Sequence, residues 1–279
     1  MSSSIPSVTL NNSVLIPQIG FGTYQIEPDD TRAATEFALE AGYRHIDTAA
    51  AYGNEAGVGE AVRACAIPRE ELFITTKLRN ADQGYESTLR AFEQSRRNLG
   101  VETIDLYLIH WPYPRHGLFV ESWLAIERLY ADGAVRAIGV SNFLPDHLEG
   151  ILAEGTVVPA INQIELHPTF QQTSLSDFTI RHGIAVEAYS PLGQGLDLDN
   201  RAVRAIAESH GVTPAQVVLR WHLQRGFIAI PKSTTPARIL ANLDILGFSL
   251  DVSEMALVTA LESGNRTSAD PATFDFSQR

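Results

Sequence analysis

The fold is decided by the stretch LFITTKLRNADQGYESTLRAFEQSRRNLGVETIDLYLIH, residues 72–110. Its two ends, residues 72–76 and 104–109, are short apolar runs rich in β-branched and aromatic residues, which is typical of buried strands. The longer segment between them, residues 85–99, has the apolar spacing of an amphipathic helix. A strand, a helix and a second strand in this order predict two parallel strands joined by a helical crossover.

The same alternation continues along the whole chain. Eight runs are predicted strands: residues 18–23, 43–47, 72–76, 104–109, 134–140, 160–164, 184–189 and 227–230. Between them, residues 29–40, 85–99, 119–130 and 214–224 are predicted helices. Eight strand–helix units in 279 residues predict an α/β protein, a (β/α)8 TIM barrel that forms one domain over residues 1–279. An open, doubly wound sheet is the alternative. Residues 8–16 predict a β-hairpin that caps the bottom of the barrel.

The composition excludes several classes of protein. Subtracting 33 acidic from 21 basic residues gives a net charge of −12, which argues against nucleic acid and anionic membranes as partners. The one cysteine, Cys65, cannot form an internal disulfide and fits a reducing compartment. Neither a secretory leader nor an apolar run near the ~18 residues of a membrane span is found, so we expect a cytoplasmic protein.

Ionisable residues end three consecutive predicted strands. Asp47, Lys77 and His110 hold these positions, and Tyr52 lies on the loop after Asp47. In a barrel, the carboxyl ends of the strands form the active-site rim. An ammonium beside a tyrosine is expected to lower the pKa of the phenol, and a carboxylate holds the ammonium in place. A neutral imidazole can hydrogen-bond a carbonyl oxygen, so the four predict carbonyl reduction. Alternatively, Asp47 and Lys77 form an ion pair that only closes the barrel.

Carbonyl reduction needs a hydride donor, and no side chain supplies one, so a nicotinamide cofactor is implied. The pair Gly57 and Gly59 is an incomplete dinucleotide fingerprint inside a predicted helix, which we interpret as a chance match. The loop from Lys232 to Arg238 follows the last strand and is a candidate site for the 2′-phosphate of NADP. Tyr189 ends a strand and can stack on a nicotinamide ring, while Ser141, Asn142 and Gln163 can hydrogen-bond its carboxamide.

Nine motifs together resemble the aldo-keto reductase family. They are Gly20-Phe21-Gly22-Thr23, Tyr43-Arg44-His45-Ile46-Asp47-Thr48-Ala49, Tyr52-Gly53-Asn54-Glu55, Thr76-Lys77, residues 105–112, Gly139-Val140-Ser141-Asn142-Phe143, residues 162–168, Tyr189-Ser190-Pro191-Leu192-Gly193 and Ile230-Pro231-Lys232-Ser233. They span nearly the whole chain in order. Residues 192–195 and 218–224 resemble the bacterial 2,5-diketo-D-gluconate reductases of that family.

The resemblance implies a (β/α)8 barrel, often monomeric, that binds NADPH in extended form. It implies Tyr52 as general acid, tuned by Lys77 and Asp47, with His110 orienting a small-molecule carbonyl substrate. The expected cofactor contacts are Gly22, Thr23, Asp47, Ser141, Asn142, Gln163, Tyr189, Ser190, Leu192, Gln194, Lys232, Ser233, Thr234, Arg238 and Asn242. The expected substrate contacts are Tyr24, Tyr52, Arg79, His110 and Trp111.

The predicted function is NADPH-dependent reduction of aldehydes, α-dicarbonyls, keto sugars or keto acids to alcohols. Arg79 replaces an aromatic residue that relatives often carry, and we expect it to favour an acidic or polyhydroxylated substrate. One alternative is a non-enzymatic NADP(H)-binding regulator on the same fold. Another is a metal-dependent barrel hydrolase that uses His45, Asp47, His110 and His167, although no metal is otherwise expected.

Overall fold

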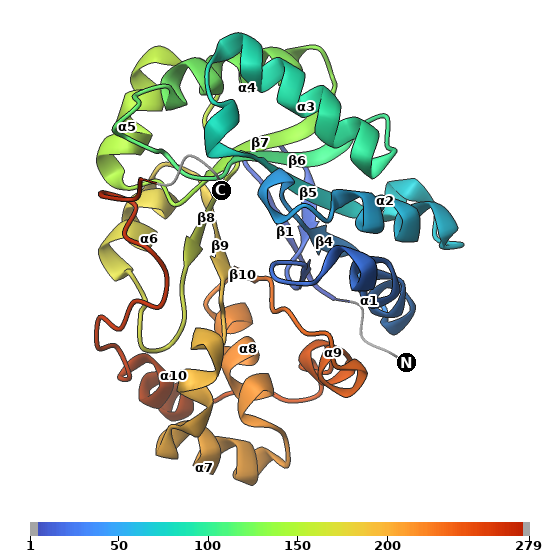
Figure 1. Cartoon of the computed structure of the whole chain (residues 1–279). Helices are drawn as coiled ribbons and strands as arrows, with labels where there is room; N and C mark the ends of the chain where they lie inside the picture. Colours follow the sequence, from blue (N-terminus) through green and yellow to red (C-terminus); the bar gives the residue numbers. More distant parts are fainter. Residues whose placement is uncertain (1–4, 276–279) are drawn as a thin grey trace.

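The computed structural model describes residues 5–275. Eight parallel strands are hydrogen-bonded in chain order, and helices surround them (Figure 1). They are β3 (Phe21–Gly22), β4 (His45–Asp47), β5 (Phe73–Leu78), β6 (Ile104–Ile109), β7 (Val135–Ser141), β8 (Ile161–Glu165), β9 (Ala185–Tyr189) and β10 (Ile228–Ala229). A parallel bridge between Ile19 and Ala229 joins the first strand to the last, so the sheet closes into a ring. The predicted (β/α)8 barrel is therefore confirmed, and the open sheet is not observed.

The strands lie where the apolar runs predict them, except at the closure of the ring. There β3 and β10 have only two residues each, shorter than the predicted 18–23 and 227–230. The neighbouring backbone still bonds across the seam, because the Ala229 amide donates to the Gln18 carbonyl at 3.0 Å and the Ala229 carbonyl accepts from the Gly20 amide at 2.9 Å. A side chain at Gly20 would collide with His45, so the close approach at the seam needs this glycine.

Helices follow most of the strands. They are α1 (Pro28–Ala41), α2 (Glu55–Ala64), α3 (Tyr85–Leu99), α4 (Phe119–Ala131), α5 (Pro145–Glu154), α6 (Thr173–Arg181), α7 (Arg201–His210), α8 (Pro214–Gln224), α9 (Pro236–Leu243) and α10 (Val252–Thr259), with short 3-10 turns η1 (Ala50–Tyr52), η2 (Arg69–Glu71), η3 (Asn80–Asp82) and η4 (Gly193–Asp199). Local sequence sets their ends: Thr213 caps the start of α8 with Gln216, and Gly100 ends α3 in a left-handed conformation. None of the helices between residues 5 and 275 has the length and apolar character needed to span a bilayer.

The main core lies between the outer face of the ring and the helices. Ile46, Ile74 and Ile109 point outward from their strands into this layer, where Trp123 of α4 is fully buried. Gly57 and Gly59 lie within α2, as predicted, and a side chain at Gly59 would meet the Leu99 carbonyl at 2.3 Å. Gly59 therefore allows α2 to pack closely on α3, Gly57 allows α2 to pack closely on α1, and the two do not form a nucleotide-binding turn.

A hairpin closes the bottom of the barrel, as predicted. Its strands, β1 (Ser7–Thr9) and β2 (Leu15–Pro17), pair antiparallel, with Val8 opposite Ile16. Leu10 and Ile16 pack against the inward side chains at the start of the barrel strands, which include Phe73, Leu106, Ala137, Ile161 and Ile228. The floor is thus apolar, which leaves the carboxyl ends of the strands as the polar end of the barrel.

Candidate active site

Inward-pointing residues alternate along each strand, and the alternation brings Asp47 and Lys77 together. Both lie at the carboxyl end of a barrel strand, and both are buried. The Lys77 Nζ donates to Asp47 Oδ1 at 2.6 Å and to the Thr48 carbonyl at 2.9 Å. Because two hydrogen bonds and an opposite charge compensate the buried ammonium, Lys77 is fixed at one point of the rim.

Tyr52 lies on η1, directly after β4. Its hydroxyl oxygen lies 3.4 Å from Lys77 Nζ, and the Lys77 Nζ lies 5.1 Å from the centre of the phenol ring. Burial and the charge of Asp47 raise the pKa of Tyr52 well above its usual value. The expectation that the pKa of Tyr52 is lowered is therefore wrong, because burial, the largest cause, and the charge of Asp47 both raise it. Tyr52 keeps its proton at neutral pH, as a proton donor must.

His110 directly follows β6 and faces Tyr52. The two ring centres are 5.5 Å apart, with the rings nearly perpendicular. Burial and the nearby Lys77 charge lower the pKa of His110 well below 6.5, so the imidazole is neutral at neutral pH, as predicted. Its Nδ1 is buried without a hydrogen-bond partner among the described residues. The four residues that the strand ends single out thus meet in one place.

Gln163 connects this group to an acid that the sequence analysis missed. The Gln163 Nε2 donates at 2.8 Å both to Asp47 Oδ2 and to Glu187 Oε2. Glu187 is fully buried on β9, and its other oxygen lies 3.6 Å from His45 Nε2. Burial and the charge of Asp47 raise the pKa of Glu187 to about 8. In the sequence, Glu187 is one acid within a predicted buried strand, and only that mismatch of polarity and burial could have identified it.

The residues expected to hold a carboxamide form one hydrogen-bonded row. Asn142 donates to the His110 carbonyl at 3.0 Å and accepts from the Tyr189 hydroxyl at 2.8 Å. Ser141 donates to the Gln163 carbonyl at 2.9 Å. Asn142 has a left-handed backbone with φ 65°, a conformation common at functional sites. The row is therefore rigid and lies beside His110.

Gly22 and Thr23 lie at the end of β3 and contact the rim through their backbones. Thr23 is fully buried, and both its amide and its hydroxyl donate to the Asp47 carbonyl, at 2.9 and 3.0 Å. A side chain at Gly22 would lie 3.0 Å from the Ile230 carbonyl. The Thr23 side chain thus helps to position Asp47.

The other expected cofactor contacts lie on two segments that follow β9 and β10. Ser190 and Gln194, with Leu192 between them, have left-handed backbones at φ 47° and 53°. Lys232 and Arg238 are exposed at the loop before α9 and on its first turn, and neither forms a salt bridge with a residue in the range 5–275. Thr234 is exposed, whereas Ser233 and Asn242 are buried. Two uncompensated cations near a helix start fit a phosphate group, so this donor set is compatible with NADPH.

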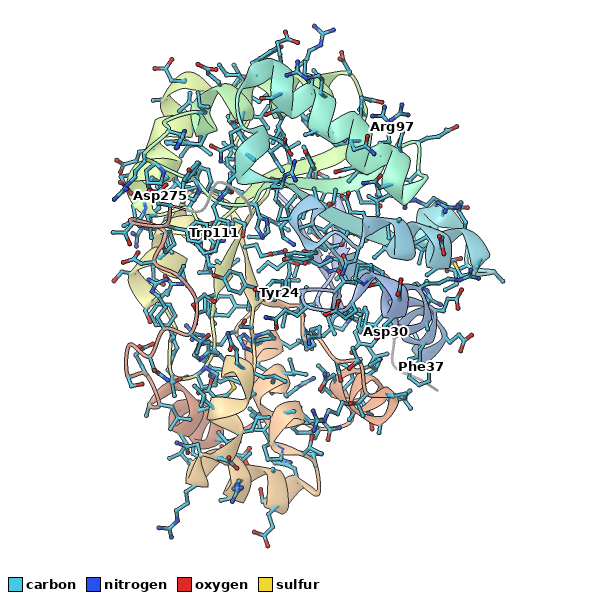
Figure 2. All side chains as sticks on the ribbon, in the orientation of Figure 1. Tyr24, Asp30, Phe37, Arg97, Trp111 and Asp275 are labelled. Carbon is cyan, nitrogen blue, oxygen red and sulfur yellow. The ribbon has the colours of Figure 1, made fainter. Side chains whose placement is uncertain are left out.

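Aromatic side chains surround the opening above Tyr52. Tyr24 packs on Tyr52 with ring centres 5.1 Å apart, and Trp111 stacks on Phe274 at 4.1 Å. Figure 2 shows Tyr24 near the middle of the molecule and Trp111 close to Asp275. Arg79 donates to both oxygens of Asp82, at 3.0 and 3.2 Å. Its charge is thus partly neutralised within the protein.

The residues named for the hydrolase alternative do not come together as a metal-binding group within residues 5–275. No group of three or more histidine, cysteine, aspartate or glutamate side chains within residues 5–275 could hold a metal ion. His167 instead bonds to Glu165 and Asp197, away from Lys77.

A barrel with this rim defines a class of carbonyl-reducing enzymes, and comparison with known proteins identifies the family. The Aldo/keto reductase family model matches residues 18–263, so the chain belongs to the aldo/keto reductase family. It is 51% identical to an aldo-keto reductase of Mycolicibacterium smegmatis over 97% of this chain and 98% of that protein. It is 48% identical to the 9,11-endoperoxide prostaglandin H2 reductase of Trypanosoma cruzi, over 98% of each chain. A crystal structure of a Gox0644 variant in complex with NADPH superposes with a TM-score of 0.95 at 46% identity, covering 98% of this chain and all of that one.

Proposed function

We propose that this chain catalyses the NADPH-dependent reduction of carbonyl compounds, with Tyr52 as the proton donor. The observation that carries the proposal is the position of Lys77 Nζ, 2.6 Å from Asp47 and 3.4 Å from the Tyr52 hydroxyl. A buried ammonium that touches a protonated phenol is suited to stabilise the phenolate that forms when the phenol gives up its proton.

Each of the four side chains has its own role in the proposed reaction. Tyr52 donates its proton to the carbonyl oxygen, and Lys77 then stabilises the phenolate, with Asp47 keeping the ammonium charged and in place. His110 is neutral, and its imidazole would donate a hydrogen bond to the same oxygen, which orients the carbonyl. The carbonyl carbon gains a hydride and the oxygen gains the proton, so the product is an alcohol.

Bound NADPH supplies the hydride. We propose that Lys232 and Arg238 hold its 2′-phosphate and that Tyr189 stacks on the nicotinamide, since the two cations have no salt-bridge partner in the described range. Ser141, Asn142 and Gln163 would hold the carboxamide. The remaining contacts would come from Gly22, Thr23, Asp47, Ser190, Leu192, Gln194, Ser233, Thr234 and Asn242. Family membership and the NADPH complex of the Gox0644 variant support this assignment.

The proposed substrates are aldehydes, α-dicarbonyls, keto sugars or keto acids. Tyr24 and Trp111 would form apolar walls beside the carbonyl. Arg79, which pairs with Asp82, would meet a charged or hydroxylated tail. We further propose a cytoplasmic monomer that forms one domain over residues 1–279, in keeping with the single Cys65 and with the described barrel.

The test combines turnover with cofactor binding. Oxidation of NADPH is followed with a panel that includes methylglyoxal, a nitrobenzaldehyde and 2,5-diketo-D-gluconate, in wild type and in Tyr52→Phe. We expect wild-type turnover and a loss of at least ~10²-fold in Tyr52→Phe, with the NADPH Kd from tryptophan fluorescence unchanged. Tight NADPH binding without turnover of any carbonyl would contradict the proposal and favour the regulator.

A further inference from the structure

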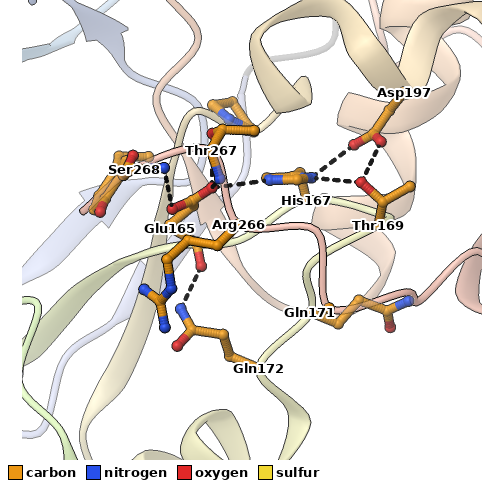
Figure 3. A network of polar contacts seen from close by, with 12 residues as sticks. Glu165, His167, Thr169, Gln171, Gln172, Asp197, Arg266, Thr267 and Ser268 are labelled. Carbon is orange, nitrogen blue, oxygen red and sulfur yellow. Dashed lines mark hydrogen bonds and ion pairs between the residues drawn. The ribbon is translucent and has the colours of Figure 1, made fainter. Parts of the chain in front are cut away.

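Three buried residues, Glu165, His167 and Asp197, and the half-buried Thr169 form a chain of hydrogen bonds outside the reacting group (Figure 3). His167 lies in the middle: its Nδ1 is 2.9 Å from Asp197 Oδ2, and its Nε2 is 3.2 Å from Glu165 Oε1. Thr169 donates to the other oxygen of Asp197 at 2.7 Å. Glu165, His167 and Asp197 are at most 1% exposed. Each nitrogen of one rigid ring thus meets a different carboxyl group.

The charges make this bridge strong. Burial lowers the pKa of His167, but the hydrogen bonds and charges of Asp197 and Glu165 outweigh burial and raise the pKa to about 9. Burial raises the pKa of Glu165, but hydrogen bonds from His167, Thr267 and Ser268 outweigh it and lower the pKa to about 2. At neutral pH, an imidazolium therefore donates one hydrogen bond to each of two carboxylates, and such charge-assisted bonds are the stronger kind.

Glu165 holds a segment that reaches the substrate opening. We call residues 263–275 the C-terminal strap. Thr267 donates to Glu165 Oε1 from its amide at 2.6 Å and from its hydroxyl at 2.7 Å, and the Ser268 amide donates to Oε2 at 3.0 Å. The strap runs from the side of α10 past α6 (Figure 1) and ends where Phe274 stacks on Trp111. The position of the strap at the opening thus depends on Glu165.

On the other side of His167, Asp197 holds the loop η4. It belongs to η4, which follows Tyr189 and contains Gln194, one of the expected cofactor contacts. A side chain at Gly193 would lie 2.6 Å from Asp197 Oδ2 and 3.0 Å from His167 Nδ1, so the loop backbone packs directly on the bridge. Gly193 and Gln194 both have left-handed backbones, at φ 56° and 53°. The conformation of η4 is therefore fixed against His167.

We propose that His167 is a positioning residue that ties η4 to the C-terminal strap and so couples cofactor affinity to substrate affinity. The inference rests on the proposed function, because η4 is assigned to the cofactor there. A shift of Asp197 on cofactor binding turns or moves the ring, and the ring passes the shift to Glu165 and the strap. A histidine that only fills the core would stabilise both segments without linking the two affinities.

The test measures each affinity after a change on the opposite side. Glu165→Gln alters the strap side, and its direct effect is on the carbonyl KM at saturating NADPH. We expect it also to raise the NADPH Kd, measured by tryptophan fluorescence without turnover, about fivefold. Asp197→Asn alters the cofactor side, and we expect it also to raise the carbonyl KM. In a His167→Gln background, adding Glu165→Gln should no longer change the NADPH Kd.

The controls separate coupling from damage. His182→Gln changes an exposed histidine that bonds only a carbonyl of its own helix, and both constants should match wild type. If Glu165→Gln does not fold, Thr267→Val takes its place, because it removes only the hydroxyl bond to Glu165. An NADPH Kd that stays at the wild-type value in the strap-side variant overturns the coupling. A wild-type protein that fails to bind NADPH contradicts the proposed function instead, so the two failures are distinguishable.

Discussion

Asp47 and Glu187 accept hydrogen bonds from the same atom, the Nε2 of Gln163, each at 2.8 Å. Both carboxyl groups are buried, and Lys77 forms its ion pair with Asp47 alone. Burial and the Asp47 charge together raise the pKa of Glu187 to about 8. At neutral pH, Glu187 is therefore a carboxylic acid, joined through Gln163 to the carboxyl group that pairs with Lys77.

The proton on Glu187 makes the stability of the protein depend on pH. Its pKa is about 8 in the folded protein and about 4.5 in the unfolded chain. The stability that this proton contributes is thus fully present below pH 4.5 and is lost as the pH rises through 8. Glu187→Gln resembles the protonated acid and cannot ionise. We expect its free energy of unfolding in urea to fall less from pH 5 to 8.5 than that of wild type, by on the order of 1–3 kcal/mol.

The control for this prediction is Glu40→Gln, which changes an exposed glutamate on α1. Its stability should follow the wild-type curve at every pH. His167 also contributes pH dependence, but equally in all three proteins, so the difference between curves isolates Glu187. Parallel curves for Glu187→Gln and wild type would show that Glu187 is already ionised at neutral pH.

Variants of the Lys77–Asp47 ion pair can distinguish its contribution to stability from its contribution to catalysis. Lys77→Met leaves the buried Asp47 carboxylate without its cation, and we expect a loss of about 3–5 kcal/mol in urea unfolding. The double variant with Asp47→Asn removes both charges and should recover most of that stability. Its kcat should stay at least ~10²-fold below wild type, because nothing then stabilises the Tyr52 phenolate. Recovery of both stability and kcat would mean that the pair only closes the barrel.

The cations after β10 should distinguish NADPH from NADH. Lys232→Ala and Arg238→Ala each remove one charge from the proposed 2′-phosphate site, and we expect the NADPH Kd to rise about tenfold in each. The NADH Kd should not change, since NADH lacks that phosphate. Arg97→Ala, on the exposed face of α3 (Figure 2), is the matched control and should leave both constants unchanged. Equal weakening of NADH and NADPH would place the 2′-phosphate elsewhere.

The sequence predicts the strands and the catalytic rim for the same physical reason. An apolar run that ends in an ionisable residue marks both a buried strand and its carboxyl end, and Asp47, Lys77 and His110 all carry this signal. The contact between Trp111 and Phe274 could not be predicted from the sequence, because this stacking joins segments that are far apart in the chain.

Two other features depend on distances that a sequence does not contain. The direction of the Tyr52 pKa shift is set by how deeply the phenol is buried and by how close Asp47 lies, and the residue types alone suggest the opposite sign. Likewise, Glu165 and Asp197 are ordinary acids in the sequence. Only the fold places one on each side of His167.

The hairpin at the floor leaves the carboxyl ends of the strands as the polar end of the barrel. Leu10 and Ile16 seal the lower end with apolar contacts, and His45 and Glu187, which lie above them, are fully buried. Water and protons that exchange with these two groups must therefore travel past Lys77, along the route that a substrate uses. A ligand that fills the opening isolates the inner layer from bulk solvent. We therefore expect a bound ligand to slow the exchange of the Glu187 proton with solvent.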